Sequence, residues 1–219
     1  MAATATIYGT PFSTYVRTVR MALEEKGAPY ELVDVSVLGG EQKQPAHLAR
    51  NPFGTVPAFE HDGLKLHETS AVARYVDQVF PGPQLTPEDP AERACMNQII
   101  SVIDYHGYRS IILQVVAPRL FTPLLPAGAD GEAIVEAGLP TAELCLREFE
   151  RMMDATLMGA DPFLAGGRLS LADLYLVPVV HYLTLTPDKN LLDRHAGLTR
   201  WWRAMSERPS VAGTVPQLG

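Results

Sequence analysis

The sequence contains few cysteines and no cysteine motif. Cys95 and Cys145 are the only two in 219 residues, and they form no Cys-x-x-Cys pair. This count argues against a disulfide scaffold and against a cysteine-based zinc site. The six histidines show no His-Glu-x-x-His spacing either. We therefore expect no metal, and we expect both cysteines to be buried as small apolar residues.

An excess of basic charge and a long apolar run are also missing. The formal net charge is −7, with acidic and basic residues interspersed, so no basic face suits nucleic acid. No apolar stretch approaches the ~20 residues that a membrane-spanning helix needs. Residues 1–6 lack the basic and apolar parts of a signal peptide. We expect a cytoplasmic protein with no nucleic-acid or membrane partner.

What the sequence does contain is enough apolar residues for a packed core, in patterns that alternate between strand and helix. Hydrophobic residues make up 47% of the chain and charged residues 20%. Val16, Val19 and Leu23 recur at helical spacing, and His61-Asp62-Gly63 is typical of a hairpin turn. The expected elements are a strand over 6–8, a helix from Ser13 to Gly27, a strand over 30–37, a short helix over 45–50, hairpin strands over 57–60 and 64–67, and a helix from Thr69.

Prolines mark a boundary after this α/β part. Pro81, Pro83, Pro87 and Pro90 fall within ten residues. We therefore predict a first domain over residues 1–82, a proline-rich linker over 83–90 and a second domain over 91–219.

The second domain shows helical patterns and no convincing strand. Ser170-Leu-Ala-Asp173 resembles a capping box with Asp in place of Glu. Gly138-Leu139-Pro140 should kink or split the helix that contains it. The expected helices cover residues 91–116, 132–158, 170–185 and 198–206.

The segment Asn51-Pro-Phe-Gly-Thr-Val-Pro57 predicts a place where a peptide could dock. Proline lacks a backbone N–H and admits a cis bond. A cis Val56–Pro57 bond would leave the backbone groups of Val56 facing outward, where an extended peptide could pair with them as an added strand. The segment by itself does not say which peptide.

Several short motifs are spread over nearly the whole chain. They are Gly9-Thr-Pro-Phe-Ser13, Leu48-Ala-Arg-Asn-Pro-Phe-Gly54, Val56-Pro57, Glu68-Thr69, Leu164-Ala-Gly166, Ser170-Leu-Ala-Asp-Leu174, Trp201-Trp202 and Arg208-Pro209-Ser210. Together they resemble the glutathione S-transferases. The details look most like the phi class and its bacterial relatives, which use a serine. The resemblance implies a thioredoxin-like α/β N-terminal domain with a mixed four-stranded sheet and an all-α C-terminal domain. It also implies a homodimer that acts in detoxification, with glutathione as co-substrate.

Such chemistry needs the glutathione thiolate. An ordinary thiol has a pKa of about 8.5, and lowering that pKa by about 2 takes roughly 2.7 kcal/mol. A hydrogen bond to a charged group supplies roughly 1.5–3 kcal/mol, and a helix N-terminus adds roughly 0.3–1 kcal/mol. We therefore expect Ser13, at a helix start, to donate to the sulfur. The alternative is that Ser13 only caps the helix. Thr14 and Tyr8 are the rival catalytic residues.

The remaining glutathione contacts follow from the resemblance. Val56 would pair with the cysteinyl unit, while Glu68 and Thr69 would hold the γ-glutamyl ammonium and carboxylate. Lys43 could meet the glycine carboxylate, although it could equally be a solvated loop residue. For Glu68 and Thr69 the alternative is an ordinary acidic helix start. The full expected set is Lys43, Thr55, Val56, Pro57, Glu68 and Thr69.

The chain departs from the phi pattern at three places. Gln42-Lys43 stands where the class usually has His-Lys, Thr55 stands where it has Gln, and Glu68-Thr69 stands where it has Glu-Ser. The last change keeps the hydroxyl. The first two remove or shorten a polar contact.

The second substrate would be a hydrophobic electrophile, bound between the domains and above the sulfur. The candidate residues for its site are Phe12, Tyr105, Tyr108, Ile112 and Phe121, each of which could instead belong to the core. The thiolate would attack the electrophile by substitution or addition. Two other functions stay open: a non-catalytic binding protein for apolar ligands, and a glutathione-dependent peroxidase. Disulfide exchange is disfavoured because position 13 is not a cysteine.

Overall fold

The structure is a computed structural model that describes residues 4–156 and 163–217. It forms two compact units. The N-terminal unit combines the described residues up to Leu85 with those from Pro209 onward, and the helical unit covers 86–208. The sequence patterns placed residues 209–219 with the helical domain, whereas their packing places the described part of them with the N-terminal unit.

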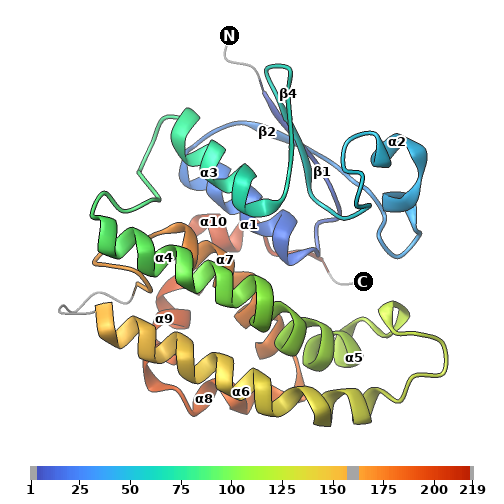
Figure 1. The fold of residues 1–219 in the computed structure, drawn as a ribbon, viewed down its shortest axis with the longest axis vertical. Helices are drawn as coiled ribbons and strands as arrows, with labels where there is room; N and C mark the ends of the chain where they lie inside the picture. The colour runs from blue at the N-terminus through green and yellow to red at the C-terminus, as the bar shows by residue number, and fades with distance from the viewer. Residues whose placement is uncertain (1–3, 157–162, 218–219) are drawn as a thin grey trace. The chain divides into compact units, whose positions relative to one another are not determined.

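The N-terminal unit contains a mixed four-stranded sheet (Figure 1). The strands are β1 (Ala5–Tyr8), β2 (Tyr30–Val33), β3 (Ala58–His61) and β4 (Leu64–His67), in the order β2-β1-β3-β4. β1 runs parallel to β2 and antiparallel to β3, and β3 is antiparallel to β4. The predicted mixed four-stranded sheet is confirmed. The second strand ends at Val33 and not at residue 37, because its partner β1 ends opposite it at Tyr8.

Three helices of this unit begin close to where the sequence predicts: α1 (Thr14–Glu25), α2 (Pro45–Leu48) and α3 (Thr69–Val79). The short η1 (Glu41–Lys43) and α10 (Pro209–Ala212) are not among the predicted elements. α1 and α3 lie side by side (Figure 1). Their apolar residues Val19 and Val76 are buried, as are Ile7 of β1 and Phe59 of β3. This core fixes the start of α1 next to the end of β1.

A buried ion pair and a buried arginine hold the edges of the N-terminal unit. The Lys26 ammonium lies 2.7 Å from Asp77 at the far ends of α1 and α3. The fully buried Arg17 of α1 donates to the carbonyl of Val211 at 3.1 Å and to the hydroxyl of Thr214 at 3.4 Å. α10 and the residues that follow it are thereby held against α1. Arg17 therefore has a clear structural role in this unit.

The helical unit contains no strand within its described residues. Its elements are α4 (Pro90–Val102), the π-helix η2 (Ile103–Val116), α5 (Ala117–Leu120), η3 (Thr122–Leu124), α6 (Gly131–Thr156), α7 (Leu171–Thr184), η4 (Pro187–Lys189), α8 (Asn190–Asp193) and α9 (Ala196–Ser206). α4 and η2 together match the predicted long helix. Every described helix is too short or too polar to serve as a membrane span.

α6 continues through Pro140 and does not split there. Pro140 is exposed, whereas its neighbours Val135 and Ala142 are buried, so apolar packing on the inner side holds the helix together. Residues 157–158, the end of the predicted helix, lie outside the described residues. Cys145 on α6 is buried as expected, but Cys95 on α4 is only half-buried.

The capping box predicted at the start of α7 is present. The carboxylate of Asp173 accepts hydrogen bonds from the backbone N–H and the hydroxyl of Ser170, both at 2.8 Å. It also accepts from the backbone N–H of Leu164 and the indole N–H of Trp201, both at 2.9 Å. Burial raises the pKa of Asp173, and these four donors oppose that rise. The residue joins three segments of the helical core.

Candidate functional site

Ser13 lies at the N-cap of α1, as predicted. Its backbone is extended (φ −66°, ψ 129°), and its hydroxyl oxygen accepts a hydrogen bond from the backbone N–H of Val16 at 3.4 Å. This bond uses a lone pair and leaves the hydroxyl hydrogen to donate. Ser13 is half-buried, and the first turn of α1 carries no acidic residue. The positive end of the helix is therefore not neutralised by a local carboxylate.

Tyr8 and Thr14, the two rivals, are in different surroundings. The Tyr8 hydroxyl donates to the Glu60 carboxylate at 3.3 Å, and the guanidinium of Arg50 lies 4.1 Å from the centre of its ring. Arg50 is itself paired with Glu60 at 3.2 Å. Thr14 is 6% exposed, and its hydroxyl makes no hydrogen bond within the described structure. The Tyr8 hydroxyl hydrogen is thus occupied, whereas that of Thr14 is buried.

The Val56–Pro57 bond is cis, as the sequence analysis anticipated. Val56 is half-buried, and Pro57 is buried. The pairing of β3 with β1 begins one residue later, at Ala58, opposite Tyr8. Val56 therefore lies just outside the register of the sheet, close to where β1 leads into the loop before Ser13.

Glu68 precedes α3 in an unusual backbone conformation. Its φ is +66° and its ψ is 112°, values that a residue other than glycine rarely adopts. Such strain tends to persist at functional positions. The Glu68 side chain is exposed and does not cap the helix, while Thr69, the first residue of α3, is 7% exposed. An exposed carboxylate thus stands beside a helix N-terminus, where backbone N–H groups can bind an anion.

Lys43 is exposed, and its ammonium donates to the carbonyl of Phe53 at 3.1 Å. Its side chain lies directly over Gly54, where a Cβ atom would come within 2.7 Å of the Lys43 chain. Gly54 also has a positive φ of 61°, so this position favours glycine on two counts. Lys43 is thereby held beside the segment that leads to Val56, with further ammonium hydrogens left to donate.

Sequence reasoning missed two residues of this region, His47 and Asn51. Both are buried and donate to the backbone carbonyl of Thr55 at 2.8 Å. Asn51 belongs to the Asn-Pro-Phe-Gly motif, so its presence was a usable signal. His47 belongs to none of the motifs found in the sequence. Its role depends on a contact with Thr55, which local sequence patterns do not predict.

Two other histidines make polar contacts within the fold. His61 lies 2.9 Å from the Tyr75 hydroxyl, and His195 lies 2.9 Å from Glu150. Among the side chains that the structure describes, no three His, Cys, Asp or Glu residues gather where they could hold a metal ion.

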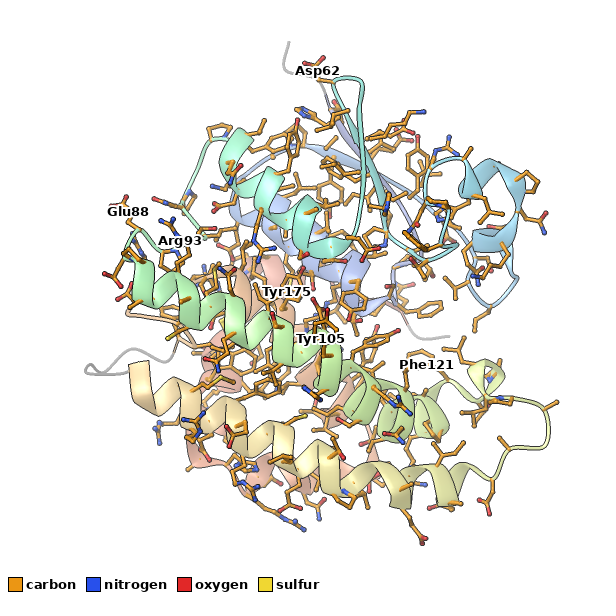
Figure 2. All side chains as sticks on the ribbon, in the orientation of Figure 1. Asp62, Glu88, Arg93, Tyr105, Phe121 and Tyr175 are labelled. Carbon is orange, nitrogen blue, oxygen red and sulfur yellow. The ribbon has the colours of Figure 1, made fainter. Side chains whose placement is uncertain are left out.

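The residues expected at a hydrophobic site belong to both units. Phe12 is in the N-terminal unit, and the other four are in the helical unit. Tyr105 is 79% exposed on η2, whereas Ile112, two turns further on, is 8% exposed. Tyr108 between them is half-buried, and burial raises its pKa. Figure 2 shows Tyr105 on the long helix and Phe121 beyond its end, where Phe121 packs edge-on against Tyr182.

Comparison with known proteins places the chain in a family. Residues 7–84 match the glutathione S-transferase N-terminal domain, and residues 112–209 match the C-terminal domain. Glutathione S-transferase 1 of Zea mays is 33% identical over 94% of this chain and 92% of its own length. Glutathione S-transferase F13 of Arabidopsis thaliana is 30% identical over 97% of this chain and 95% of its own.

Solved structures give the same result. Glutathione transferase F7 from Populus trichocarpa superposes with a TM-score of 0.84 at 31% identity, covering 96% of this chain and 97% of its own. A glutathione S-transferase-I with lactoylglutathione bound gives a TM-score of 0.82 at 32% identity, covering 97% and 98%. The chain belongs to the glutathione S-transferase family and is most similar to its plant phi class.

Proposed function

We propose that the chain is a serine-type glutathione transferase in which Ser13 stabilises the glutathione thiolate. The observation that carries this proposal is the placement of the Ser13 hydroxyl at the N-terminus of α1. Its oxygen accepts from Val16, which leaves its hydrogen for the sulfur. Tyr8 fits the role less well because its hydroxyl already donates to Glu60.

The energy available matches the task. A hydrogen bond to a charged sulfur contributes roughly 1.5–3 kcal/mol, and the helix N-terminus contributes roughly 0.3–1 kcal/mol. About 2.7 kcal/mol lowers a thiol pKa by about 2. Ser13 keeps its own proton throughout. The glutathione sulfur is the nucleophile, so no covalent enzyme intermediate forms.

Glutathione would bind in an extended form along the N-terminal unit. Val56 would pair with its cysteinyl backbone. Glu68 would hold the γ-glutamyl ammonium, and the hydroxyl and N–H of Thr69 would hold the adjacent carboxylate. Lys43, already held beside Gly54, would meet the glycine carboxylate. The relative crystallised with lactoylglutathione supports a glutathione-type ligand for this fold.

The second substrate would be a hydrophobic electrophile, attacked by substitution or addition. Phe12, Tyr105, Tyr108 and Phe121 are the side chains that we propose to contact it. Ile112 is the weakest candidate, because it is 8% exposed within the helical unit. We further propose a homodimer that acts in the cytoplasm in detoxification.

A conjugation assay with a generic aryl halide tests the catalytic assignment. Ser13→Ala should lower kcat/KM at neutral pH by about 10- to 100-fold, because it removes one hydrogen bond to a charged group. The loss should shrink toward pH 9, where glutathione ionises in solution. Tyr8→Phe should keep kcat/KM within about threefold, because it removes only a bond to Glu60.

Two outcomes would overturn the proposal. Full activity of Ser13→Ala from pH 6 to pH 8 would remove Ser13 from the mechanism. Glutathione binding by the wild type without any turnover of aryl halides or peroxides would instead indicate a binding protein.

A further inference from the structure

Two buried side chains converge on a single backbone atom next to Val56. The His47 ring Nε2, from α2, lies 2.8 Å from the carbonyl oxygen of Thr55, and the Asn51 side-chain Nδ2 lies 2.8 Å from the same oxygen. His47 is 4% exposed and Asn51 is 1% exposed. The loop that contains Thr55 is therefore held by two polar side chains that are shielded from water.

The donor and the acceptor of each hydrogen bond in this contact can be assigned. A carbonyl only accepts hydrogen bonds, so Nε2 of His47 must carry its hydrogen. A carbonyl has two lone pairs, and these two donors use both. Both N–H hydrogens of the Asn51 carboxamide are used as well, and its oxygen accepts one hydrogen bond. Its NH₂ group donates to the carbonyl and, at 3.0 Å, to the hydroxyl of Thr55, while its oxygen accepts from the Phe53 N–H at 3.1 Å.

Holding this oxygen also sets the direction of the next N–H group. The Thr55 carbonyl and the Val56 N–H belong to one peptide plane, and in a trans peptide they point in opposite directions. The only cis peptide bond in the described chain is the following one, Val56–Pro57. Because the Thr55 oxygen is drawn toward His47 and Asn51, the Val56 N–H must point away from them.

We propose that His47 and Asn51 are positioning residues for glutathione. They hold the Thr55 carbonyl and thereby aim the Val56 N–H at the cysteinyl backbone of the bound tripeptide. The inference rests on the proposed role of Val56 in glutathione binding. Their side-chain hydrogen bonds in the described structure go to Thr55 and Phe53 and not to Ser13, so we expect their effect on binding and not on the chemical step.

The same contacts suggest why Thr55 can stand where the phi class usually has the longer Gln. Its hydroxyl oxygen accepts a hydrogen bond from Asn51 at 3.0 Å, which holds the side chain toward the loop. Thr55 therefore contributes through its carbonyl and through the short bond that keeps its side chain against the loop.

The test compares His47→Leu with His47→Gln in the full-length protein. Leu removes the donor at similar volume, whereas the Gln side-chain NH₂ can reach the position of Nε2. His47→Leu should raise the KM and the Kd for glutathione about 2- to 10-fold, the effect of one neutral hydrogen bond. The kcat at saturating glutathione and the KM for the aryl halide should stay within about twofold of the wild type. The lost interaction stabilises bound glutathione equally before and in the transition state, so its removal weakens binding and not the chemical step. His47→Gln should restore the KM for glutathione to within about twofold of the wild type.

A matched control separates positioning from stability. Lys26→Met breaks the buried pair with Asp77 in the same unit, and Lys26 makes no hydrogen bond or ion pair with residues 51–57 in the described structure. It should lower the midpoint of thermal unfolding without raising the KM for glutathione. If Lys26→Met raises this KM as much as His47→Leu does, or if His47→Gln fails to rescue it, the inference is overturned.

A second variant covers the case in which His47→Leu does not fold. Asn51→Ser keeps a polar group at the buried position but is too short to reach the Thr55 carbonyl, and it should raise the Kd for glutathione in the same way. Calorimetric titration of wild type with glutathione distinguishes the two proposals. No binding by the wild type contradicts the proposed function, whereas equal binding by the wild type and both loop variants contradicts only this inference.

Discussion

Two serines in this protein stand at the N-cap of a helix, and they have opposite surroundings. Ser170 begins α7, is 0% exposed and donates to Asp173 through both its backbone N–H and its hydroxyl. Ser13 begins α1, is half-buried and accepts one long hydrogen bond of 3.4 Å. The first turn of α7 contains Asp173, whereas the first turn of α1 contains no acid.

The difference separates a cap that serves stability from one that we propose serves chemistry. The Ser170 hydroxyl hydrogen is already donated to a carboxylate inside the core, so none is left for a ligand. The Ser13 hydroxyl retains its hydrogen and lies at a helix end whose positive potential is not neutralised nearby. A cap residue whose hydroxyl hydrogen is already donated within the protein supports the fold. A cap residue whose hydroxyl hydrogen is not donated can bind an anion such as a thiolate.

The largest expected effect is on the buried cap. Asp173→Ala would leave four buried donors without an acceptor, each costing about 1–3 kcal/mol. We expect the free energy of unfolding to fall by more than about 3 kcal/mol, as measured by urea denaturation. A loss below about 1 kcal/mol would mean that the helical core does not depend on this carboxylate.

The second prediction compares the effects of removing each cap. Ser170→Ala should lower the free energy of unfolding by about 1–2 kcal/mol and leave the kcat/KM of the folded protein unchanged. Ser13→Ala should lose no more than about 1 kcal/mol of stability, because its capping bond is long, yet lose activity about 10- to 100-fold. The measurements are denaturation and conjugation kinetics on both variants. If both variants show the same ratio of stability loss to activity loss, the contrast between the caps is wrong.

The smallest expected effect concerns Thr14. Its hydroxyl is buried without a hydrogen bond in the described structure, so Thr14→Val replaces an unsatisfied group by an apolar one of the same shape. The substitution should change the free energy of unfolding by less than about 1 kcal/mol and kcat/KM by less than about twofold. A loss of kcat/KM comparable with that of Ser13→Ala would transfer the catalytic role to Thr14.

Local signals in the sequence were enough for much of the fold. Asp62 and Gly63 both adopt positive φ, as the tight hairpin turn requires, and their residue types announced it. The Ser170–Asp173 box and the Ser13 cap were also visible, because capping depends on residues three apart. Short motifs also predicted the local structure at the candidate site, namely the Ser13 cap, the bond after Val56 and the helix that begins at Thr69.

Contacts across the fold were not predictable from these patterns. The alternation of valines continues to residue 37, but β2 ends where β1 stops offering a partner. Pro140 does not divide α6, because packing on the opposite side outweighs one lost backbone bond. His47 looked like an isolated histidine until the fold brought it to the Thr55 carbonyl.

The contact between α1 and the segment after α9 makes the chain topologically nested. Arg17 and Arg20 hold residues 211–214, so the N-terminal unit is assembled from two stretches of sequence with the whole helical unit inserted between them. During synthesis, α1 leaves the ribosome well before the residues that accept hydrogen bonds from its arginines. The unit that carries Ser13 therefore acquires its full set of contacts only after the helical unit has been translated.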